Sequence, residues 1–350
     1  MRGRGSGSPM SGKSEILFVL KSDYTPSARI RFLDLLPFLD ERGVAYEVAY
    51  LPKSNAERKR LFKRGAAFDA VVLQKRLPSL WDFKTLRKNA KKLAFDFDDA
   101  VHLKNASPST NEQDYKSATR ARRFKRIISS VDLVIAANNV LAEAAAPFVR
   151  GAETAVLPSS VDTSPFQPPN PERPLSDPPV VGWVGTKVAA THLLHFAPAL
   201  RAAREKTDFT LRIVSNEKFE IPGLNVENVE WTLEGEPEEI SRFDIGIMPL
   251  SNDPYSRGKS SYKLLQYMAA GVPAVASAVG MNVEVAGKDG RNAELAETPD
   301  EFAAKLAELL DNPAKRATLA VNGKKEVETK YSRGAVGKQF AEIMERLAGK

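Results

Sequence analysis

Residues 244–284 read DIGIMPLSNDPYSRGKSSYKLLQYMAAGVPAVASAVGMNVE, and their pattern decides the fold. The opening DIGIMPL is an apolar run of strand length, and Ser251 to Gly258 are typical of a loop. Tyr262 to Ala270 is predicted to form a helix, which Gly271 and Pro273 end. The run AVAS is then the next strand. A strand, a helix and a second strand in this order form the repeating unit of an α/β domain.

The start of this helix is predicted to bind an anion. A loop that leads from a strand into a helix aims free backbone N–H groups, and the positive end of the helix dipole, at whatever lies above the sheet edge. Arg257, Lys259 and Lys263 add positive charge here, and Ser260 and Ser261 add hydroxyl donors. These groups suit a phosphate or a diphosphate. The alternative is a solvated helix cap, because an exposed lysine needs no ligand.

The composition is that of an ordinary globular protein with two domains. The chain has 350 residues, which is long for one core, and 43% of them are hydrophobic and 27% charged. Apolar runs stay well below the roughly 18 residues of a membrane span, and no signal-peptide core follows the N-terminus, so we expect a cytoplasmic protein. Without cysteine, and with only His102, His192 and His195, the chain is not expected to hold a metal centre.

The same alternation of strands and helices organises the rest of the chain. Residues 1–13 are rich in Gly, Ser and Arg and are expected to be a disordered extension. Residues 14–163 and 180–330 each alternate short apolar strands with amphipathic helices, which predicts a doubly wound parallel sheet in each domain. The proline-rich residues 164–179 are predicted to link them, and residues 331–350 to form a helix that packs back on the first domain. Ligands of such domain pairs bind in the cleft that the carboxyl ends of the strands face.

Three further segments are each predicted to form a single helix. They cover about residues 27–42 and 111–129 in the first domain and 189–206 in the second.

The second domain begins with VVGWVGTK, which repeats the order of strand, turn and helix. Gly185 permits a tight turn, and Thr186 is placed either to cap the helix or to donate to a phosphate, with Lys187 beside it. On its own this corner is a common structural joint. Its occurrence in one domain with the Lys259 to Lys263 segment favours a contact with the same ligand. The chain has neither a Walker-type loop nor a dinucleotide-binding GxGxxG motif.

The order of these motifs resembles the group 1 glycosyltransferases. The resemblance is carried by the 244–284 stretch, by VVGWVGTK before it, by VDLVIAANNVLAEAAAPF and VLPSSVD at the end of the first domain, and by the tail from DGRNAELAE to KYS. It implies two Rossmann-like domains of the glycosyltransferase B-type fold. It also implies a retaining enzyme whose donor is a nucleoside diphosphate sugar, with no further cofactor.

In this resemblance the C-terminal domain holds the donor. The residues that it places near the diphosphate and its helix start are Gly185, Thr186, Lys187, Lys259, Ser260, Ser261 and Lys263. The turn of Gly280, Met281 and Asn282 would lie near the donor sugar. Two positions depart from the family, which usually carries two glutamates eight residues apart. Gly258 here has no side chain, and Gln266 offers the ribose an amide without charge.

The first domain carries polar groups at two strand ends. DYTPSARIRF places Arg29 and Arg31 at a helix start, and LAFDFDDAVHL places Asp98, Asp99 and His102 after a strand. The resemblance puts acceptor-facing groups here, and we assign Arg29, Asp98 and Asp99 to the acceptor side. Asp99 joins Lys187 and Lys263 as a predicted catalytic group. Alternatively the acidic run is a helix cap with a solvated loop, and His102 is structural.

A basic helix in the first domain carries Arg120, Arg122, Arg123 and Arg126 beside an apolar stripe. It is either a solvated face or a surface for an anionic acceptor or for the inner face of an acidic membrane. Nucleic acid is not an expected partner, because the basic clusters lack interleaved aromatic residues for base stacking.

The sequence therefore predicts a glycosyltransferase that moves a sugar from a nucleoside diphosphate to a glycan or a lipid-linked acceptor with retention. The alternative is a catalytically weak nucleotide-sugar-binding or scaffold protein of the same fold, which the two missing glutamates favour.

Overall fold

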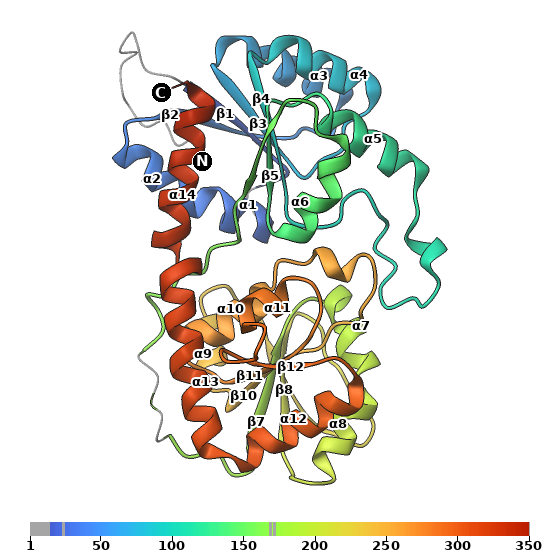
Figure 1. Ribbon diagram of the computed structural model, residues 1–350, viewed down its shortest axis with the longest axis vertical. Coiled ribbons are helices and arrows are strands. Elements are labelled where there is room, and N and C mark those ends of the chain that lie inside the picture. The colour runs from blue at the N-terminus through green and yellow to red at the C-terminus, as the bar shows by residue number, and fades with distance from the viewer. Residues whose placement is uncertain (1–14, 23–24, 168–169, 171–172, 350) are drawn as a thin grey trace.

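The computed structural model describes residues 15–22, 25–167, 170 and 173–349. Within these residues each half of the chain holds one six-stranded sheet whose paired strands all run parallel (Figure 1). The predicted extension at residues 1–13 lies outside the described residues.

The first sheet has the strand order β2-β1-β3-β4-β5-β6. Its strands are β1 (Glu15–Leu20), β2 (Ala45–Tyr50), β3 (Ala70–Gln74), β4 (Lys92–Phe97), β5 (Leu133–Ala136) and β6 (Glu153–Val156). Its helices are α1 (Pro26–Arg31), α2 (Leu36–Glu41), α3 (Asn55–Arg64), α4 (Leu80–Asn89), α5 (Ala118–Ile128) and α6 (Asn139–Ala145). The central strands are buried on both faces, which is why they are continuous apolar runs and do not alternate.

The second sheet has the order β12-β11-β10-β7-β8-β9. Its strands are β7 (Val180–Val184), β8 (Thr210–Ser215), β9 (Asn225–Glu230), β10 (Ile245–Met248), β11 (Ala274–Ser277) and β12 (Glu294–Ala296). Its helices are α7 (Lys187–His195), α8 (Ala197–Arg204), α9 (Glu236–Ser241), α10 (Tyr262–Ala269), α11 (Met281–Ala286), α12 (Pro299–Asp311) and α13 (Pro313–Glu326). The two sheets confirm the fold class predicted from the sequence.

The last helix, α14 (Arg333–Ala348), returns to the first domain (Figure 1). A π-helical turn, Val327–Tyr331, joins it to α13. The Phe340 ring lies 6.0 Å from the ring of Phe18 in β1 and 5.9 Å from that of Phe32. Helix α14 is therefore part of the core of the first domain, although it is the last element of the chain.

The three long helices predicted over 27–42, 111–129 and 189–206 are wrong, because each region is interrupted. Phe32 has φ −134° and ends α1, and α2 begins anew with Pro37 in its first turn. A 3₁₀ turn precedes α5, which Ser117 caps by accepting a hydrogen bond from the Arg120 N–H. Helices α7 and α8 separate at Phe196, and Pro198 lies in the first turn of α8. A proline without an N–H favours the start of a new helix over the interior of a long one.

None of the helices in the described ranges is both long and apolar enough to span a membrane.

Candidate functional site

The two domains meet at the carboxyl ends of their strands. The loop after β10 carries Asp253, whose carboxylate accepts a hydrogen bond of 2.9 Å from the Ser107 hydroxyl of the first domain. Asn138, just after β5, donates from Nδ2 to the carbonyl oxygens of Gly258 at 3.3 Å and Lys259 at 3.2 Å. These bonds hold the loop that precedes α10 against the first domain.

The absence of a side chain at Gly258 permits this close contact. A Cβ atom at position 258 would lie 2.9 Å from Leu141 Cδ2 and 3.1 Å from Ala100 Cβ, both in the first domain. A glutamate, as the resemblance would place here, would force Leu141 and the backbone at Ala100 to shift while the two domains are in contact. Close domain packing is thus the physical reason for this departure.

The start of α10 presents its backbone amides without a cap. Ser261 has φ 52°, and in the described part of the chain no side chain caps the first turn. The Ser261 hydroxyl instead donates to Asn282 Oδ1 at 2.7 Å, and Asn282 Nδ2 donates to the Ser277 carbonyl at 2.9 Å. Both side chains are buried, so they fix the loop and are not free for a ligand. The amides of the first turn are the groups left to bind an anion.

Lys263 lies at this helix start and packs on Trp183. Its Nζ is 5.6 Å from the centre of the indole ring, and a Cβ on Gly185 would come within 2.9 Å of its Cε. Burial lowers the pKa of Lys263 to about 8 and the neighbouring Lys259 acts in the same direction, whereas Glu236 acts in the opposite one. No carboxylate among the described residues forms an ion pair with it. An ammonium group that is desolvated without a direct ion pair is suited to an anionic ligand.

His192 of α7 faces the same region and carries no charge at neutral pH. Its Nδ1 accepts the Ser251 N–H at 3.3 Å. Burial lowers the pKa of His192 to about 4, and Lys259 adds to the effect. Sequence reasoning assigned His192 no role, because only the packing of α7 beside the β10 loop reveals it.

Gln266 is turned away from solvent and bonded to Glu236. Only 5% of Gln266 is exposed, and its Nε2 donates to Glu236 Oε2 at 2.7 Å. The other carboxylate oxygen of Glu236 accepts the Trp231 Nε1–H at 2.7 Å. A carboxylate is therefore present beside Gln266, but α9 supplies it. Sequence reasoning missed Glu236, which lies thirty positions earlier in an acidic helix start.

The acidic run after β4 is divided between two roles. Asp96 forms a fully buried ion pair with Arg31, whose Nη1 also donates to the Leu157 carbonyl at 2.8 Å. This pair lies in the interior of the first domain. Asp98 and Asp99 instead pair with Lys75, at 2.9 Å in the case of Asp98. Burial alone would lower the pKa of Lys75, but these two carboxylates outweigh it and raise that pKa.

Asp99 lies at the domain boundary. Burial and the adjacent Asp98 raise its pKa, whereas Lys75 and Lys259 act in the opposite direction. Lys259 thus interacts electrostatically with Asp99 of one domain and with His192 and Lys263 of the other. Sequence reasoning missed Lys75, although its position at the end of a strand was a signal.

The other predicted site residues are exposed or have structural roles. Lys187 is 74% exposed and pairs loosely, at 3.7 Å, with Glu217. Thr186 precedes α7 without forming a side-chain cap. His102 stacks on Phe124 with ring centres 5.0 Å apart, as expected for a structural histidine.

The remaining acceptor-side and sugar-side residues have clear positions. Arg29 lies 3.5 Å from Asp34 and close to the Tyr262 hydroxyl of the second domain. Gly280 and the buried Met281 begin α11, and Gly280 has φ 55°. Ser260 is partly exposed at the helix start.

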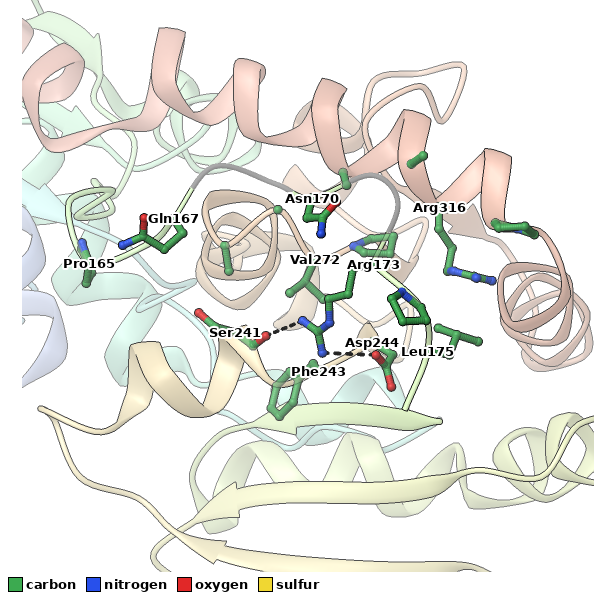
Figure 2. A pocket seen from close by; sticks show the side chains of 17 residues that line it. Pro165, Gln167, Asn170, Arg173, Leu175, Ser241, Phe243, Asp244, Val272 and Arg316 are labelled. Carbon is green, nitrogen blue, oxygen red and sulfur yellow. Dashed lines mark hydrogen bonds and ion pairs between the residues drawn. The ribbon is translucent and has the colours of Figure 1, made fainter. Parts of the chain in front are cut away.

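A hollow of about 330 Å³ lies at the opposite end of the second sheet (Figure 2). Arg173 crosses it and donates to the Ser241 carbonyl at 2.7 Å and to Asp244 at 3.2 Å. Asp244 also accepts the Val180 N–H at 2.8 Å. These bonds anchor the interdomain linker, and we assign this hollow no part in the candidate site.

Comparisons with known proteins agree with the fold. Residues 178–312 match the model of the family described as glycosyl transferases group 1. The chain is 29% identical over 217 residues to the MMP alpha-(1->4)-mannosyltransferase of Mycolicibacterium hassiacum, a match that covers 55% of this chain and 48% of that protein. The chain thus spans about half the length, or less, of the curated relatives that it matches.

Two solved structures superpose on nearly the whole chain. Sucrose-phosphate synthase from Thermosynechococcus elongatus has a TM-score of 0.73 at 16% identity, covering 96% of this chain and 99% of that one. Anabaena Alr3699/HepE, solved in complex with UDP-glucose, has a TM-score of 0.68 at 16% identity, covering 95% and 99%. The chain has the two-domain glycosyltransferase B-type fold.

Proposed function

We propose that the chain is a glycosyltransferase that moves a sugar, with retention, from a nucleoside diphosphate to a glycan or lipid-linked acceptor. Lys263 is the observation that carries the proposal, because it is a partly buried cation without a carboxylate partner among the described residues, beside an uncapped helix start. The matched family segment contains this helix, and the Anabaena neighbour was solved with a sugar nucleotide. We place the enzyme in the cytoplasm, with the exposed Arg120 and Arg122 of α5 touching the acidic inner membrane face.

The proposed chemistry is stabilisation of the leaving group. As the bond between the sugar and the diphosphate stretches, negative charge grows on the phosphate oxygens. Lys263 and the first amides of α10 are already oriented, so they stabilise that charge more than they stabilise the bound donor. Contact between the domains around Gly258 would exclude water and limit hydrolysis of the donor.

Titration calorimetry with a panel of nucleoside diphosphates tests donor binding. The Lys263→Ala variant should bind the preferred nucleotide about 1.5–3 kcal/mol more weakly, the range for a hydrogen bond to a charged group. Lys288→Ala is the control, because Lys288 is an exposed lysine of the same domain and lies in the loop after α11. Equal affinities for the two folded variants would refute the assignment of Lys263. The anomeric configuration of the product, read by NMR, tests retention.

The second candidate is a nucleotide-sugar-binding protein with little turnover. Gly258 favours it, because this position supplies no carboxylate and a side chain there would displace atoms of the first domain. Nucleotide binding without any transfer or hydrolysis of the cognate donor would support this candidate. Turnover that Lys263→Ala abolishes would exclude it.

A further inference from the structure

A second cavity, of about 520 Å³, lies in the first domain where β1, β2 and β3 end. The carboxyl edge of a parallel sheet is where ligands of doubly wound domains bind. The described residues that line the cavity include five cations, which are Lys21, Lys53, Arg58, Arg76 and Arg123. Asp82 is the one carboxylate among them. The cavity is therefore strongly electropositive.

Only one of these cations is neutralised by the cavity's own carboxylate. Arg58 Nε lies 3.3 Å from Asp82 Oδ2. Arg123 uses Nη1 to donate to the Leu77 carbonyl at 3.3 Å, a contact that leaves its charge uncompensated. Lys21, Lys53 and Arg76 are exposed, and within the described part of the chain none of them pairs with a carboxylate.

The backbone separates two adjacent cations at this edge. Lys75 has φ 57°, a left-handed conformation that is uncommon for a residue with a side chain. Its ammonium group is bound by Asp98 and Asp99, whereas Arg76, the next residue, lines the cavity. At the end of β3, the Lys75 side chain therefore lies at the domain boundary and the Arg76 side chain lines the cavity.

We propose that this cavity binds a phosphate group of the acceptor, so that the enzyme acts on phosphorylated acceptors. The inference rests on the proposed function and specifies its substrate class. A cavity of this volume accommodates a phosphorylated sugar or a diphosphate headgroup. Arginine and lysine side chains bind phosphate oxygens by charge-assisted hydrogen bonds, whereas a neutral glycan would leave the cations without partners.

Calorimetry with inorganic pyrophosphate, with every variant made in a Lys263→Ala background that weakens the proposed donor site, tests this cavity separately from the donor site. In the Lys53→Gln/Arg76→Gln variant the affinity of the cavity should fall at least about tenfold, since two charge-assisted contacts are removed. Lys59→Gln/Arg60→Gln is the matched control, because both residues are exposed on α3 and do not line the cavity. The Lys263→Ala variant should retain this pyrophosphate binding. Equal pyrophosphate binding by the cavity variant and its control overturns the proposal.

Two further binding experiments distinguish a soluble phosphosugar from a lipid-linked acceptor as the ligand of the cavity. Binding of glucose 6-phosphate that the cavity variant loses indicates a soluble phosphosugar. Binding to phosphatidylcholine vesicles that contain a polyprenyl diphosphate, lost in the same variant, indicates a lipid-linked acceptor. If the cavity variant keeps its affinity for every phosphate probe, this inference fails. The proposed function still stands in that case, provided that the protein binds nucleoside diphosphate. If the wild-type protein binds no nucleoside diphosphate at all, the proposed function fails.

Discussion

At the scale of single residues, the carboxylate beside Gln266 comes from Glu236 of α9 and not from α10 itself. The Gln266 amide and the Trp231 indole both donate to Glu236, so the partly buried negative charge of that carboxylate has two donors. A glutamate at position 266 would place a second carboxylate next to that of Glu236, and the two charges would repel each other. The glutamine is therefore matched to Glu236, which explains why the chain lacks the second glutamate of the resemblance.

The Gln266→Glu variant should lower the free energy of unfolding at pH 7 by about 1–3 kcal/mol, because Glu236 loses a donor and gains a like charge. The like charge raises the pKa of the pair in the folded state above its unfolded value. The penalty should accordingly shrink as the pH falls below that raised pKa, and it should be fully present at neutral pH.

The exchange variant Glu236→Gln/Gln266→Glu restores one carboxylate and one amide. We expect it to recover most of the lost stability, as measured by urea denaturation. If the Gln266→Glu variant is as stable as the wild type at pH 7, the side chains of residues 236 and 266 do not face each other.

At the scale of elements, the loop before α10 owes its position to Gly258. Gly258→Ala should destabilise the protein by about 1–3 kcal/mol, the cost of forcing a methyl group into a packed site. Gly334→Ala is the matched control, since a Cβ at Gly334 meets no atom within 4 Å and alanine favours a helix. Thermal unfolding of both variants checks this expectation. Equal melting temperatures would mean that the domains do not pack at Gly258.

The basic helix α5 differs from the uniform face that the sequence indicated. Arg126 lies over the Phe83 ring at 6.0 Å, and Arg123 reaches the Leu77 carbonyl. Arg120 and Arg122 remain exposed. Any contact with an acidic surface through α5 must therefore rest on fewer charges than the sequence alone suggested.

At the scale of the whole molecule, α14 connects the end of the chain to the first domain. Gly337 lets the helix approach closely, since a Cβ there would lie 2.3 Å from the Phe38 ring. Phe340→Ala should cost about 3–5 kcal/mol, as for a buried phenylalanine, and the loss should concentrate in the first domain. Hydrogen exchange that resolves the two sheets measures this distribution. Faster exchange in the second sheet alone would contradict it.

Periodicity and loop chemistry were sufficient to predict both sheets and the helix start at Lys263. They were not sufficient to predict Lys75, His192 and Glu236, whose roles depend on which loops meet at the domain boundary. Pro37 and Pro198 lie in the first turns of α2 and α8, where the sequence pattern had predicted one helix across each position. Local patterns therefore specify the elements, whereas contacts between elements distant in sequence specify the site.

The central claim is that Lys263 and the start of α10 hold the diphosphate. The free protein keeps the pKa of Lys263 at about 8, and a bound diphosphate should raise that pKa. Between the two values binding takes up a proton, so affinity should be highest below pH 8 and fall above it by up to about tenfold per pH unit.

The decisive measurement is the nucleoside diphosphate affinity of wild type and Lys263→Met by calorimetry between pH 7 and pH 10. We predict that the wild-type affinity declines above pH 8 and that the variant binds weakly without this decline. The same pH dependence in both proteins, or a wild-type affinity that stays constant over the range, would contradict the account.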